Sequence, residues 1–327
     1  MPPTAYEPMG AKSILNAVKA PSMPFDWSIN PYRGCQHGCA FCYARSTHAF
    51  LGEAADDTFQ HHIFWKDKAP DILRAQLKRM SKRLPRYVAI GTATDPYQQL
   101  EGKAKLTRGC LEVLAEFGIA ASVTTRSPLV LRDLDLLRRM PGSSVNISIH
   151  SLDQDIWRTF EPSSPSPKLR IDCAAKLGDA GVPAIVFMAP ILPFLTDKPE
   201  KTEELISACA QAGVRELMPS FLRLSTPEVK SWFFSVLRQS YPQLADRYGQ
   251  LYWRTSRLPD HYRKPVHRRI AEQMSHYGLS RSVGAYLADR GTLDTAASGA
   301  FFAASPVQPM NAAVSASDCA PVQLTLF

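Results

Sequence analysis

The sequence predicts an α/β fold, a partial (βα)6 TIM-like barrel followed by a helical C-terminal extension. Three observations support it. Roughly six strand-like runs alternate with five or six segments of helical spacing, the 327 residues suffice for one large core, and 45% of them are hydrophobic. Such alternation implies parallel strands joined by crossover helices. A doubly wound open sheet shows the same alternation, so the pattern alone leaves that architecture open.

The expected strands are short runs rich in apolar and β-branched residues, at 27–30, 87–92, 120–125, 145–150, 182–189 and 214–222. Apolar residues at helical spacing place the main helices at 71–84, 106–117, 131–140, 169–180 and 200–212. In a barrel of this kind the chemistry gathers where strands end and helices begin.

Composition divides the chain into four regions. Residues 1–25 are Pro-rich and are expected to form an irregular N-terminal extension, and residues 26–226 form the barrel. Residues 227–290 are basic, aromatic-rich and helical in pattern. Residues 291–327 shift to Ala, Ser, Pro and Gly, which predicts a flexible tail.

The formal net charge of +8 suggests an anionic partner such as nucleic acid, although a modest basic excess on an ordinary surface explains it equally well. No apolar run reaches about 18 residues, so no membrane-spanning helix and no membrane partner are expected. The N-terminus lacks a signal-peptide pattern. We therefore expect a cytoplasmic protein with reduced thiols.

Seven cysteines are an odd number for such a compartment, and a disulfide framework is not expected. Cys110, Cys173 and Cys209 lie beside apolar residues in helix-like segments and are predicted to be core residues. Cys319 lies apart from the others in the tail. The remaining three cysteines fall within eight residues of one another.

This cluster consists of Cys35, Cys39 and Cys42, spaced C-x3-C-x2-C. Gly34 and Gly38 permit the tight turns that such a loop needs. Thiolates are soft ligands that suit zinc or an iron–sulfur cluster. The sequence therefore predicts a metal centre on this loop.

The identity of the metal depends on a fourth ligand. A structural zinc site wants four protein ligands, and His37 or His48 is the candidate for the fourth position. Three thiolates alone leave one iron of a [4Fe–4S] cluster open, which is a catalytic rather than a structural arrangement. Both alternatives remain open at this point.

The spacing, with aromatic Phe41 directly before the last cysteine, resembles the signature of the radical S-adenosylmethionine (SAM) superfamily. The resemblance implies a barrel of the radical SAM type, in which Cys35, Cys39 and Cys42 ligate three irons and SAM chelates the fourth. Reduction by an electron donor such as a flavodoxin or ferredoxin then cleaves SAM to methionine and a 5′-deoxyadenosyl radical that abstracts a hydrogen atom.

Further segments look like the branch of that superfamily related to spore photoproduct lyase and its uncharacterised relatives. The resemblance runs from about residue 13 to about residue 290 and leaves the tail uncovered. The segments that carry it are residues 30–35, 94–98, 106–108, 125–127, 132–133 and 161–167.

This resemblance implies SAM contacts at the strand ends. Thr94 matches the position after the second strand, Arg126 the basic position after the third strand, and Ser148 the polar position of the fourth strand. Arginine stands where the family often has lysine, and its guanidinium can still donate to the SAM carboxylate. Phe41 or Tyr43 matches the aromatic residue beside the adenine.

Two acidic residues, Asp95 and Glu101, are expected at the same end of the barrel, its mouth, where the strands end; there they either bind substrate or cap a helix. One departure from the lyase concerns the cysteine that returns a hydrogen atom to its product. Its position is Thr92 here, and a hydroxyl cannot replace a thiol in that role because its O–H bond is much stronger. Cys110 lies farther along, in a helix, and no catalytic residue is assigned.

The chain ends in Gln323–Phe327, with the sequence QLTLF, which resembles the pentapeptide with which bacterial repair and replication proteins bind the sliding clamp. An apolar hook on a flexible tether costs only modest loop entropy when it fills a groove. An incidental apolar C-terminus is the plainer explanation, since short motifs often match by chance.

The favoured hypothesis is thus a radical SAM enzyme acting on nucleic acid, in a context related to DNA repair. The first alternative is a radical SAM enzyme that acts on a protein or a small metabolite. The second is a non-catalytic zinc or iron–sulfur protein that the C-terminal motif recruits to DNA.

Overall fold

The computed structural model describes residues 3–19, 23–80 and 83–281. The expected flexible tail at 291–327, with Gln323–Phe327, lies outside the described residues. The last nine residues of the expected helical extension at 227–290 also lie outside them.

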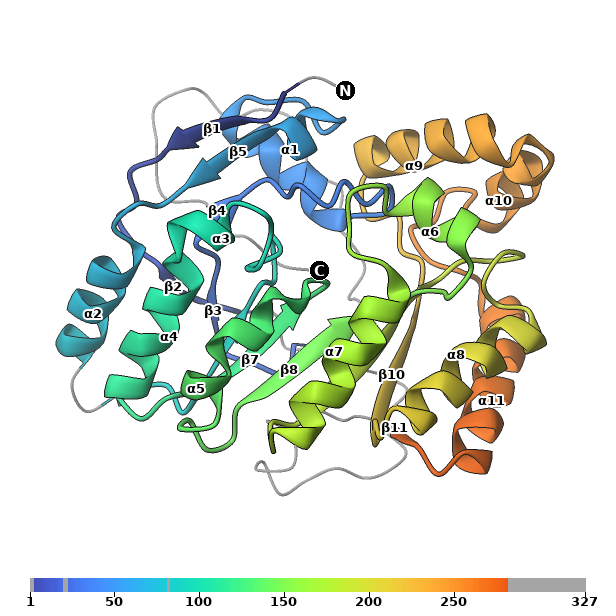
Figure 1. The fold of residues 1–327 in the computed structure, drawn as a ribbon. Coiled ribbons are helices and arrows are strands. Elements are labelled where there is room, and N and C mark those ends of the chain that lie inside the picture. Colours follow the sequence, from blue (N-terminus) through green and yellow to red (C-terminus); the bar gives the residue numbers. More distant parts are fainter. Residues whose placement is uncertain (1–2, 20–22, 81–82, 282–327) are drawn as a thin grey trace.

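The centre of the fold is an eight-stranded sheet with the order β11-β10-β9-β8-β7-β6-β3-β2 (Figure 1). Its strands are β2 Leu15–Ala17, β3 Trp27–Ile29, β6 Tyr87–Ile90, β7 Ala120–Thr125, β8 Ser144–Ser148, β9 Ala184–Ile191, β10 Glu216–Phe221 and β11 Ser280–Arg281. β2 runs antiparallel to β3, and every other neighbouring pair is parallel. The six expected strands are all present.

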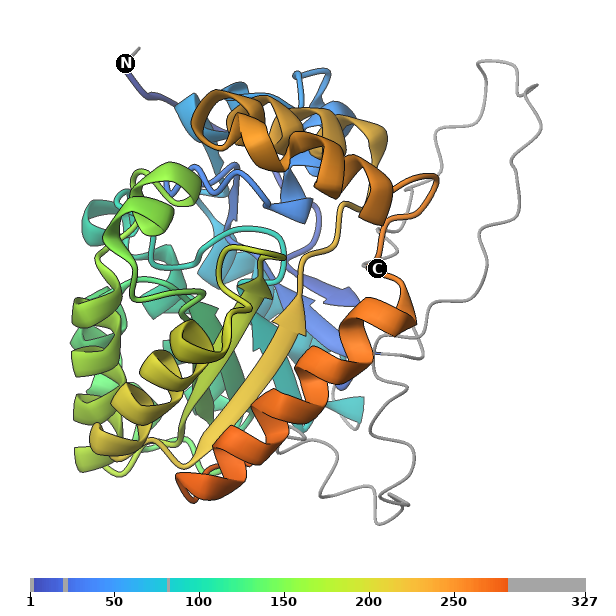
Figure 2. The ribbon, with the colours of Figure 1, turned by 90° about the vertical axis from the view of Figure 1, so that its right-hand side faces the viewer.

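The order of the strands distinguishes the two architectures that the alternation allowed. β3 and β6 to β10 neighbour one another in chain order, whereas a doubly wound sheet reverses direction and carries helices on both faces. Figures 1 and 2 show the helices on one side of the sheet. They are α2 Ala69–Met80, α4 Leu106–Glu116, α5 Leu134–Leu137, α7 Pro167–Asp179 and α8 Pro199–Gln211. Within the described residues the sheet stays open between β2 and β11, as in a partial barrel.

The main core fills the space between the sheet and this helix layer. Strands buried on both faces read as continuous apolar or small-residue runs, and all five residues of β8 are buried. Cys110, Cys173 and Cys209 are at most 1% exposed inside this core, which confirms their prediction as core residues. At the start of α7 the Ser166 hydroxyl accepts a hydrogen bond from the Leu169 backbone, which caps the helix.

One expected helix differs from the structure. Residues 131–140 were predicted to form a single helix, but a 3-10 helix at Pro128–Asp133 precedes the short α5. The junction is at Asp133, whose fully buried carboxylate accepts hydrogen bonds from Tyr97 and Arg108. These partners lie far away in the sequence, so helical spacing alone did not reveal the break.

The N-terminal region contains regular structure that its Pro-rich composition did not suggest. Besides β2, residues 1–25 include β1 (Ala5–Pro8), which pairs with β5 (His62–Trp65). β5 also pairs with β4 (Tyr32–Arg33), so a second, three-stranded sheet lies beside the barrel. Strands of two to four residues depend on their partners rather than on their own propensity, which explains why composition did not predict them.

The helical extension divides into two parts. α9 (Pro227–Ser240) and α10 (Ala245–Leu251) lie beyond the carboxyl ends of the strands, whereas α11 (Asp260–His276) packs on α8 and β10 (Figures 1 and 2). The aromatic residues of the first part are largely buried, as expected. Their core includes Phe233, Tyr248 and Tyr252, together with Cys39 and Phe41 of the cysteine loop.

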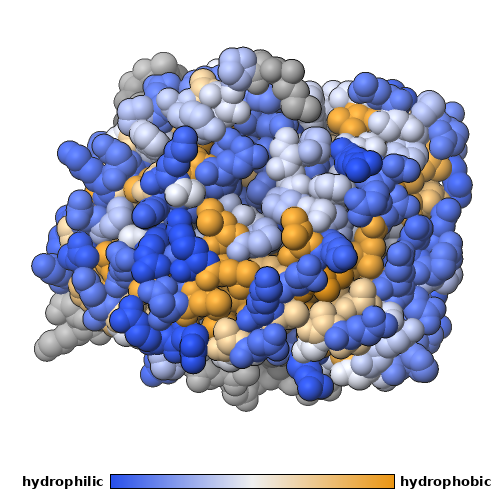
Figure 3. Space-filling model, in the orientation of Figure 1, coloured by the Kyte–Doolittle hydropathy of each residue, from blue (hydrophilic) through white to orange (hydrophobic). Residues whose placement is uncertain are grey.

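Hydrophilic side chains cover most of the face seen in Figure 3, and apolar side chains form an irregular band across its middle. None of the helices in the described part of the chain combines the length and apolar composition that a bilayer-spanning helix needs.

Candidate cofactor site at the carboxyl ends of the strands

The cysteine loop runs from β4 to a 3-10 helix at Tyr43–Leu51 and lies at the carboxyl ends of the barrel strands (Figure 1). Cys35 and Cys39 are buried, and Cys42 is half-buried. The Cys35 backbone donates to Phe59 O at 2.9 Å, and the Ala40 backbone donates to Phe160 O at 2.8 Å. Backbone hydrogen bonds from two different segments therefore fix the path of the loop.

Two glycines make this path possible. Gly34 has φ +77° and Gly38 has φ +65°, in the left-handed region that L-residues avoid. A Cβ on Gly34 would lie 2.7 Å from the backbone oxygen of His62, and a Cβ on Gly38 would overlap the side chain of Gln60. The loop thus needs both glycines for conformation and for space, as the sequence predicted.

Arg45 clamps the loop from within and was not predicted. Its side chain is fully buried, and its guanidinium donates to the backbone oxygens of Gly38 at 3.2 Å, Cys39 at 3.3 Å and Asp56. The guanidinium also lies 4.7 Å from the centre of the Trp232 ring. A buried cation is thereby placed beside the thiols, a favourable position for negatively charged thiolates.

The two histidines considered as zinc ligands point to other partners. His37 Nε2 lies 3.0 Å from Asp95 Oδ2, and His48 Nε2 lies 3.1 Å from His62 O. No group of three or more His, Cys, Asp or Glu side chains among the described residues is arranged to hold a single metal ion. A [4Fe–4S] cluster makes no such demand, because each thiolate binds a different iron. The donor set fits a cluster better than it fits zinc.

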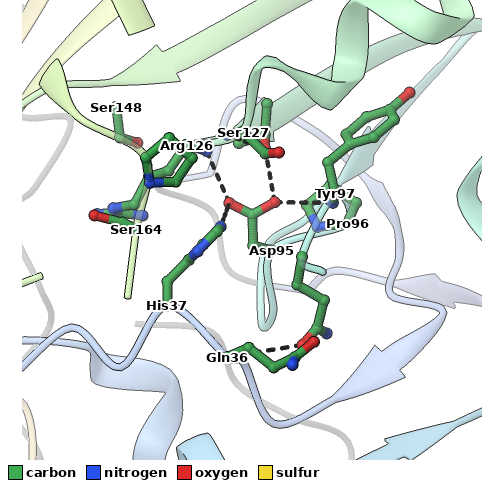
Figure 4. Close-up of polar contacts among 12 residues, drawn as sticks. Gln36, His37, Asp95, Pro96, Tyr97, Arg126, Ser127, Ser148 and Ser164 are labelled. Atoms are coloured by element: carbon green, nitrogen blue, oxygen red, sulfur yellow. Dashed lines mark hydrogen bonds and ion pairs between the residues drawn. The ribbon is translucent and has the colours of Figure 1, made fainter. Parts of the chain in front are cut away.

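Asp95 is the centre of a buried network that joins the cysteine loop to β6 and β7 (Figure 4). Besides His37, its carboxylate accepts hydrogen bonds from Tyr97 N at 2.8 Å, Thr125 Oγ1 at 2.6 Å and Arg126 N at 2.7 Å. Burial alone would raise the pKa of Asp95, but His37 and these donors lower it to about 2. Asp95 is therefore ionised, and its hydrogen bonds connect the cysteine loop, the segment after β6 and the end of β7.

Thr94 and Gln98 reinforce the same connection. Thr94 Oγ1 donates to Gly34 O at 2.6 Å, and Gln98 Nε2 donates to Thr94 Oγ1 at 3.1 Å. Gln98 Oε1 accepts from the Gln36 backbone at 3.2 Å. The structure thus places Thr94 against the cysteine loop, where its hydroxyl proton is used by the loop backbone.

Glu161 is the centre of a second buried network. Arg126 Nε lies 2.8 Å from its Oε1, while Arg170 Nη2 and His150 Nδ1 lie 2.5 Å and 3.4 Å from its Oε2. Burial opposes ionisation of Glu161, but the positive charges of Arg170 and its neighbours hold its pKa well below the ordinary value. Glu161 therefore stays ionised and fixes the guanidinium of Arg126.

The second network also reaches Ser148 and Phe41. Arg170 Nη1 donates to Ser148 O at 2.9 Å, and the rings of Phe41 and His150 meet edge to face with centres 5.4 Å apart. The Arg126 guanidinium lies 5.8 Å from the Phe41 ring centre. Phe41, Arg126 and Ser148, three of the residues expected to contact SAM, therefore lie on one connected network.

His150 Nε2 is buried and has no hydrogen-bond partner within the described part of the chain. A buried polar atom without a partner is costly, so a ligand that bonds to it is favoured. The unpaired His150 Nε2, the Arg126 guanidinium and the Phe41 ring together suit a ligand that carries both charge and an aromatic ring. These residues fit SAM.

The other expected residues lie farther from this network. Tyr43 is 43% exposed, and its hydroxyl donates to the backbone oxygen of Thr92. The Thr92 hydroxyl accepts a hydrogen bond from Asn30 Nδ2 at 2.9 Å. Glu101 is fully buried and accepts from the Thr107 backbone at 2.9 Å, at the start of α4, so it caps that helix.

Sequence reasoning missed the residues that support the site rather than line it. A motif quoted for the resemblance contained Glu161, but nothing in the local sequence paired it with an arginine 35 positions earlier. The residues without an assigned supporting role were His37, Arg45, His150, Glu161 and Arg170. Buried polar residues in otherwise apolar segments were the one available signal.

Comparison with known proteins agrees with this geometry. The family model of the radical SAM superfamily matches residues 29–206. An uncharacterised protein of Mycobacterium tuberculosis is 35% identical over 273 residues, which cover 82% of this chain and 80% of that protein. An uncharacterised protein of Methanocaldococcus jannaschii is 30% identical over 187 residues, which cover 57% of this chain and 68% of that protein.

Solved structures of spore photoproduct lyase share the fold. One mutant superimposes with a TM-score of 0.62 at 20% identity, over 84% of this chain and 81% of that chain. A second mutant structure, with bound AdoMet and dinucleoside spore photoproduct, has a TM-score of 0.57 at 20% identity, over 84% of this chain and 80% of that chain.

The family match covers more than half of the chain, and it includes the cysteine loop and the strand ends that carry both buried networks. Enzymes of this family use a [4Fe–4S] cluster and SAM and need a reductant. On this evidence the chain belongs to the radical SAM superfamily.

Proposed function

We propose that this radical SAM enzyme holds its cluster on Cys35, Cys39 and Cys42 and abstracts a hydrogen atom from a nucleic acid. The observation that carries the proposal is the cysteine loop itself. Its three thiols lie over the strand ends in a fixed path, and His37 and His48, the candidate fourth protein ligands, are engaged elsewhere. Such a donor set leaves one iron for a second ligand.

Reductive cleavage of SAM supplies the radical that removes hydrogen from the substrate. The chain's own residues bind and orient SAM. Arg126 offers a guanidinium that Glu161 holds by Nε, so its terminal amino groups serve the SAM carboxylate. Phe41 packs against the adenine, with Tyr43 as the other candidate.

Ser148 and Thr94 complete the proposed SAM site. Ser148 contributes its hydroxyl from a strand end that Arg170 fixes. The Thr94 hydroxyl proton serves the Gly34 carbonyl and Gln98 donates to its oxygen, so Thr94 would offer SAM only the remaining oxygen lone pair.

Nucleic acid is the proposed substrate class on two grounds. The chain has a net charge of +8. Structures that share its fold include spore photoproduct lyase complexed with dinucleoside spore photoproduct. Because Thr92 stands at the position of the lyase's hydrogen-donating cysteine, the reaction differs from the lyase's own route.

Anaerobic reconstitution tests the cluster assignment. We expect about four irons per chain, a broad absorbance near 400 nm and 5′-deoxyadenosine after reduction with SAM present. The C35A/C39A/C42A variant should lose the iron, whereas C173A, a matched change at a buried core cysteine, should keep it. One zinc per chain without SAM cleavage, or full iron in the triple variant, would overturn the assignment.

Deuterium transfer tests the substrate class. Oligonucleotides deuterated at the sugar or at the thymine methyl group are incubated with the reduced holoenzyme and SAM, and the 5′-deoxyadenosine is examined by mass spectrometry. Transfer of deuterium from the oligonucleotide supports the proposal. Transfer only from a labelled peptide or small metabolite would replace nucleic acid by that class.

Two partners complete the proposal. A flavodoxin or ferredoxin supplies the electron, and replacing dithionite by either protein with its reductase should support SAM cleavage. The C-terminal motif at Gln323–Phe327 binds the sliding clamp. Deleting these five residues should abolish clamp binding and leave SAM cleavage unchanged, and absence of clamp binding by the intact chain would remove this partner.

A further inference from the structure

The positive charge of the chain is concentrated in one region. Residues 223–281 contain eleven Lys and Arg but only four Asp and Glu, so this region carries seven of the eight net positive charges. It comprises the segment after β10 and the helices α9, α10 and α11. A local excess of one sign focuses the electrostatic potential and attracts an anionic partner.

Part of this region is fastened to the mouth of the barrel. Tyr252 Oη donates to Leu222 O at 2.9 Å, and the Leu224 backbone donates to Ser256 O at 3.0 Å. The loop between α10 and α11 therefore lies against the segment that leaves the carboxyl end of β10. Tyr252 also belongs to the apolar core that contains Phe41, so the same core connects this loop to the proposed cofactor site.

This loop presents an aromatic ring and a guanidinium together. Trp253 is 72% exposed, the most exposed of the large hydrophobic residues in the described part of the chain. Arg254 follows it, also exposed, with its guanidinium carbon 5.8 Å from the Trp253 ring centre. An exposed indole next to a guanidinium offers a face on which an aromatic ligand can stack.

Two more arginines flank the backbone contact of this loop, since Arg223 precedes Leu224 and Arg257 follows Ser256, and Leu224 and Ser256 are joined by the hydrogen bond at 3.0 Å. Burial lowers the pKa of Arg223, and the nearby charge of Arg257 lowers it further. Burial lowers the pKa of Arg257 as well, and the charge of Arg263 adds to that effect. Asp260 forms an ion pair with Arg263 at 2.7 Å. The combined positive charge of these arginines favours an anionic ligand at this surface.

We propose that Arg223, Trp253, Arg254 and Arg257, here called the rim surface, bind a single strand of nucleic acid, with phosphates on the arginines and an unstacked base on Trp253. The combination of aromatic faces and positive charge is typical of single-strand binding, because each base has a face to stack and each nucleotide a phosphate. A paired duplex hides its base faces, so it uses only the charges. DNA and RNA strands share this chemistry.

The inference rests on the proposed function, since it concerns how the substrate strand reaches the radical. The inference goes beyond the proposed function by naming the residues that bind the substrate and by stating that the bound nucleic acid is single-stranded. The rim surface follows β10, the strand next to the β11 edge, and the described sheet stays open, so a nucleic-acid strand can pass the carboxyl ends of the β-strands without threading through a closed ring.

Binding of fluorescent 20-nucleotide strands to the full-length holoenzyme tests the inference. We expect R254Q/R257Q to weaken binding of the single strand at least tenfold and to reduce the slope of log K against log salt by about 1.4, since each phosphate contact contributes about 0.7. W253A should weaken single-strand binding about tenfold with little change in slope, and should affect the matched duplex much less.

The matched control is R138Q/R139Q, which removes the same charge from two exposed arginines at the far end of α5. Equal weakening by this control would reduce the effect to net charge and would overturn the site, as would unchanged binding in both R254Q/R257Q and W253A. If R257Q unfolds the chain, the exposed single changes R254Q and W253A decide. The same binding measurement with DNA and with RNA of equal sequence shows which of the two nucleic acids the rim surface prefers.

Failure of this inference is distinguishable from failure of the proposed function. 5′-Deoxyadenosine formation without an added nucleic acid reports the cofactor chemistry, and the rim variants should leave it unchanged. Normal SAM cleavage and deuterium transfer with unaltered strand affinity in the rim variants would reject the rim surface alone.

Discussion

The buried charges at the carboxyl ends of the strands and the half-buried or exposed charges of the rim surface follow opposite rules. Asp95, Glu101 and Glu161 are almost inaccessible, and each accepts several hydrogen bonds from partners in other segments. Arg254 and Arg257, in contrast, lie in a region with an excess of seven positive charges. Burial makes an unpaired charge too costly to keep, whereas water screens repulsion at the surface. The first set fixes geometry, and the second is available to a ligand.

The largest expected effect comes from breaking a buried charge set. Glu161→Gln keeps the size of the side chain but leaves Arg126 and Arg170 buried against a neutral amide. Removing one partner of a buried pair costs about 3–5 kcal/mol, so we expect the free energy of unfolding to fall by that amount in urea titrations. A loss below about 1 kcal/mol would show that the network is not a structural element.

A second test compares two glycines with the same backbone conformation. Gly34 and Gly52 have φ +77° and +79°, but only Gly34 has backbone atoms where a Cβ would lie. G52A should cost about 1 kcal/mol, the price of a left-handed alanine. G34A adds overpacking of about 1–3 kcal/mol and should also lower the iron content after reconstitution. Equal effects of the two changes would contradict the described path of the cysteine loop.

The third expected effect is a pH dependence. The pKa of Asp95 falls from 3.8 to about 2 on folding, because His37, Thr125 and the Arg126 backbone favour its charged form more than burial opposes it. A depressed pKa gives stability that is present above about pH 4 and is lost as the pH falls toward 2, in total about 2 kcal/mol.

Urea unfolding of cluster-free protein between pH 5 and pH 2.5 measures this contribution. The difference in unfolding free energy between the wild type and D95N should shrink as the pH falls through this range. A difference that does not change with pH would mean that the Asp95 carboxylate is not held ionised by its partners.

The smallest effect is expected at the rim surface. R254Q and W253A each remove an exposed side chain, so the free energy of unfolding should change by less than about 0.5 kcal/mol. Thermal unfolding of the same preparations used for strand binding gives this value. A loss as large as that of Glu161→Gln would remove the contrast between the two regions.

Several parts of the molecule followed from local sequence. Alternation gave the six parallel strands, the C-x3-C-x2-C spacing with its two glycines gave the loop, and helical spacing placed Cys110 and Cys209 in the core. Residues 131–140 did not form the expected single helix, and β1 and β2 were not expected, because contacts with distant segments decide both.

The supporting residues of the site show the same limit. Arg45 was absent from the sequence-based predictions although it clamps the cysteine loop, and Arg170 was absent although it fixes Ser148. The sequence within a few positions of either arginine contains no pattern that predicts its hydrogen-bond partners. The strand ends had to be brought together before their roles were visible.

By itself, the sequence determined the order of strands and helices and the trio of thiols, since both are written in spacing over a few residues. Only the tertiary structure decided that the strands neighbour one another in chain order, that Asp95 and Glu161 each tie several segments together, and that the loop carrying Trp253 lies against the segment after β10. The physical reason is that charge pairing and burial depend on distance in space, which the sheet sets by bringing the carboxyl ends of its parallel strands to one edge.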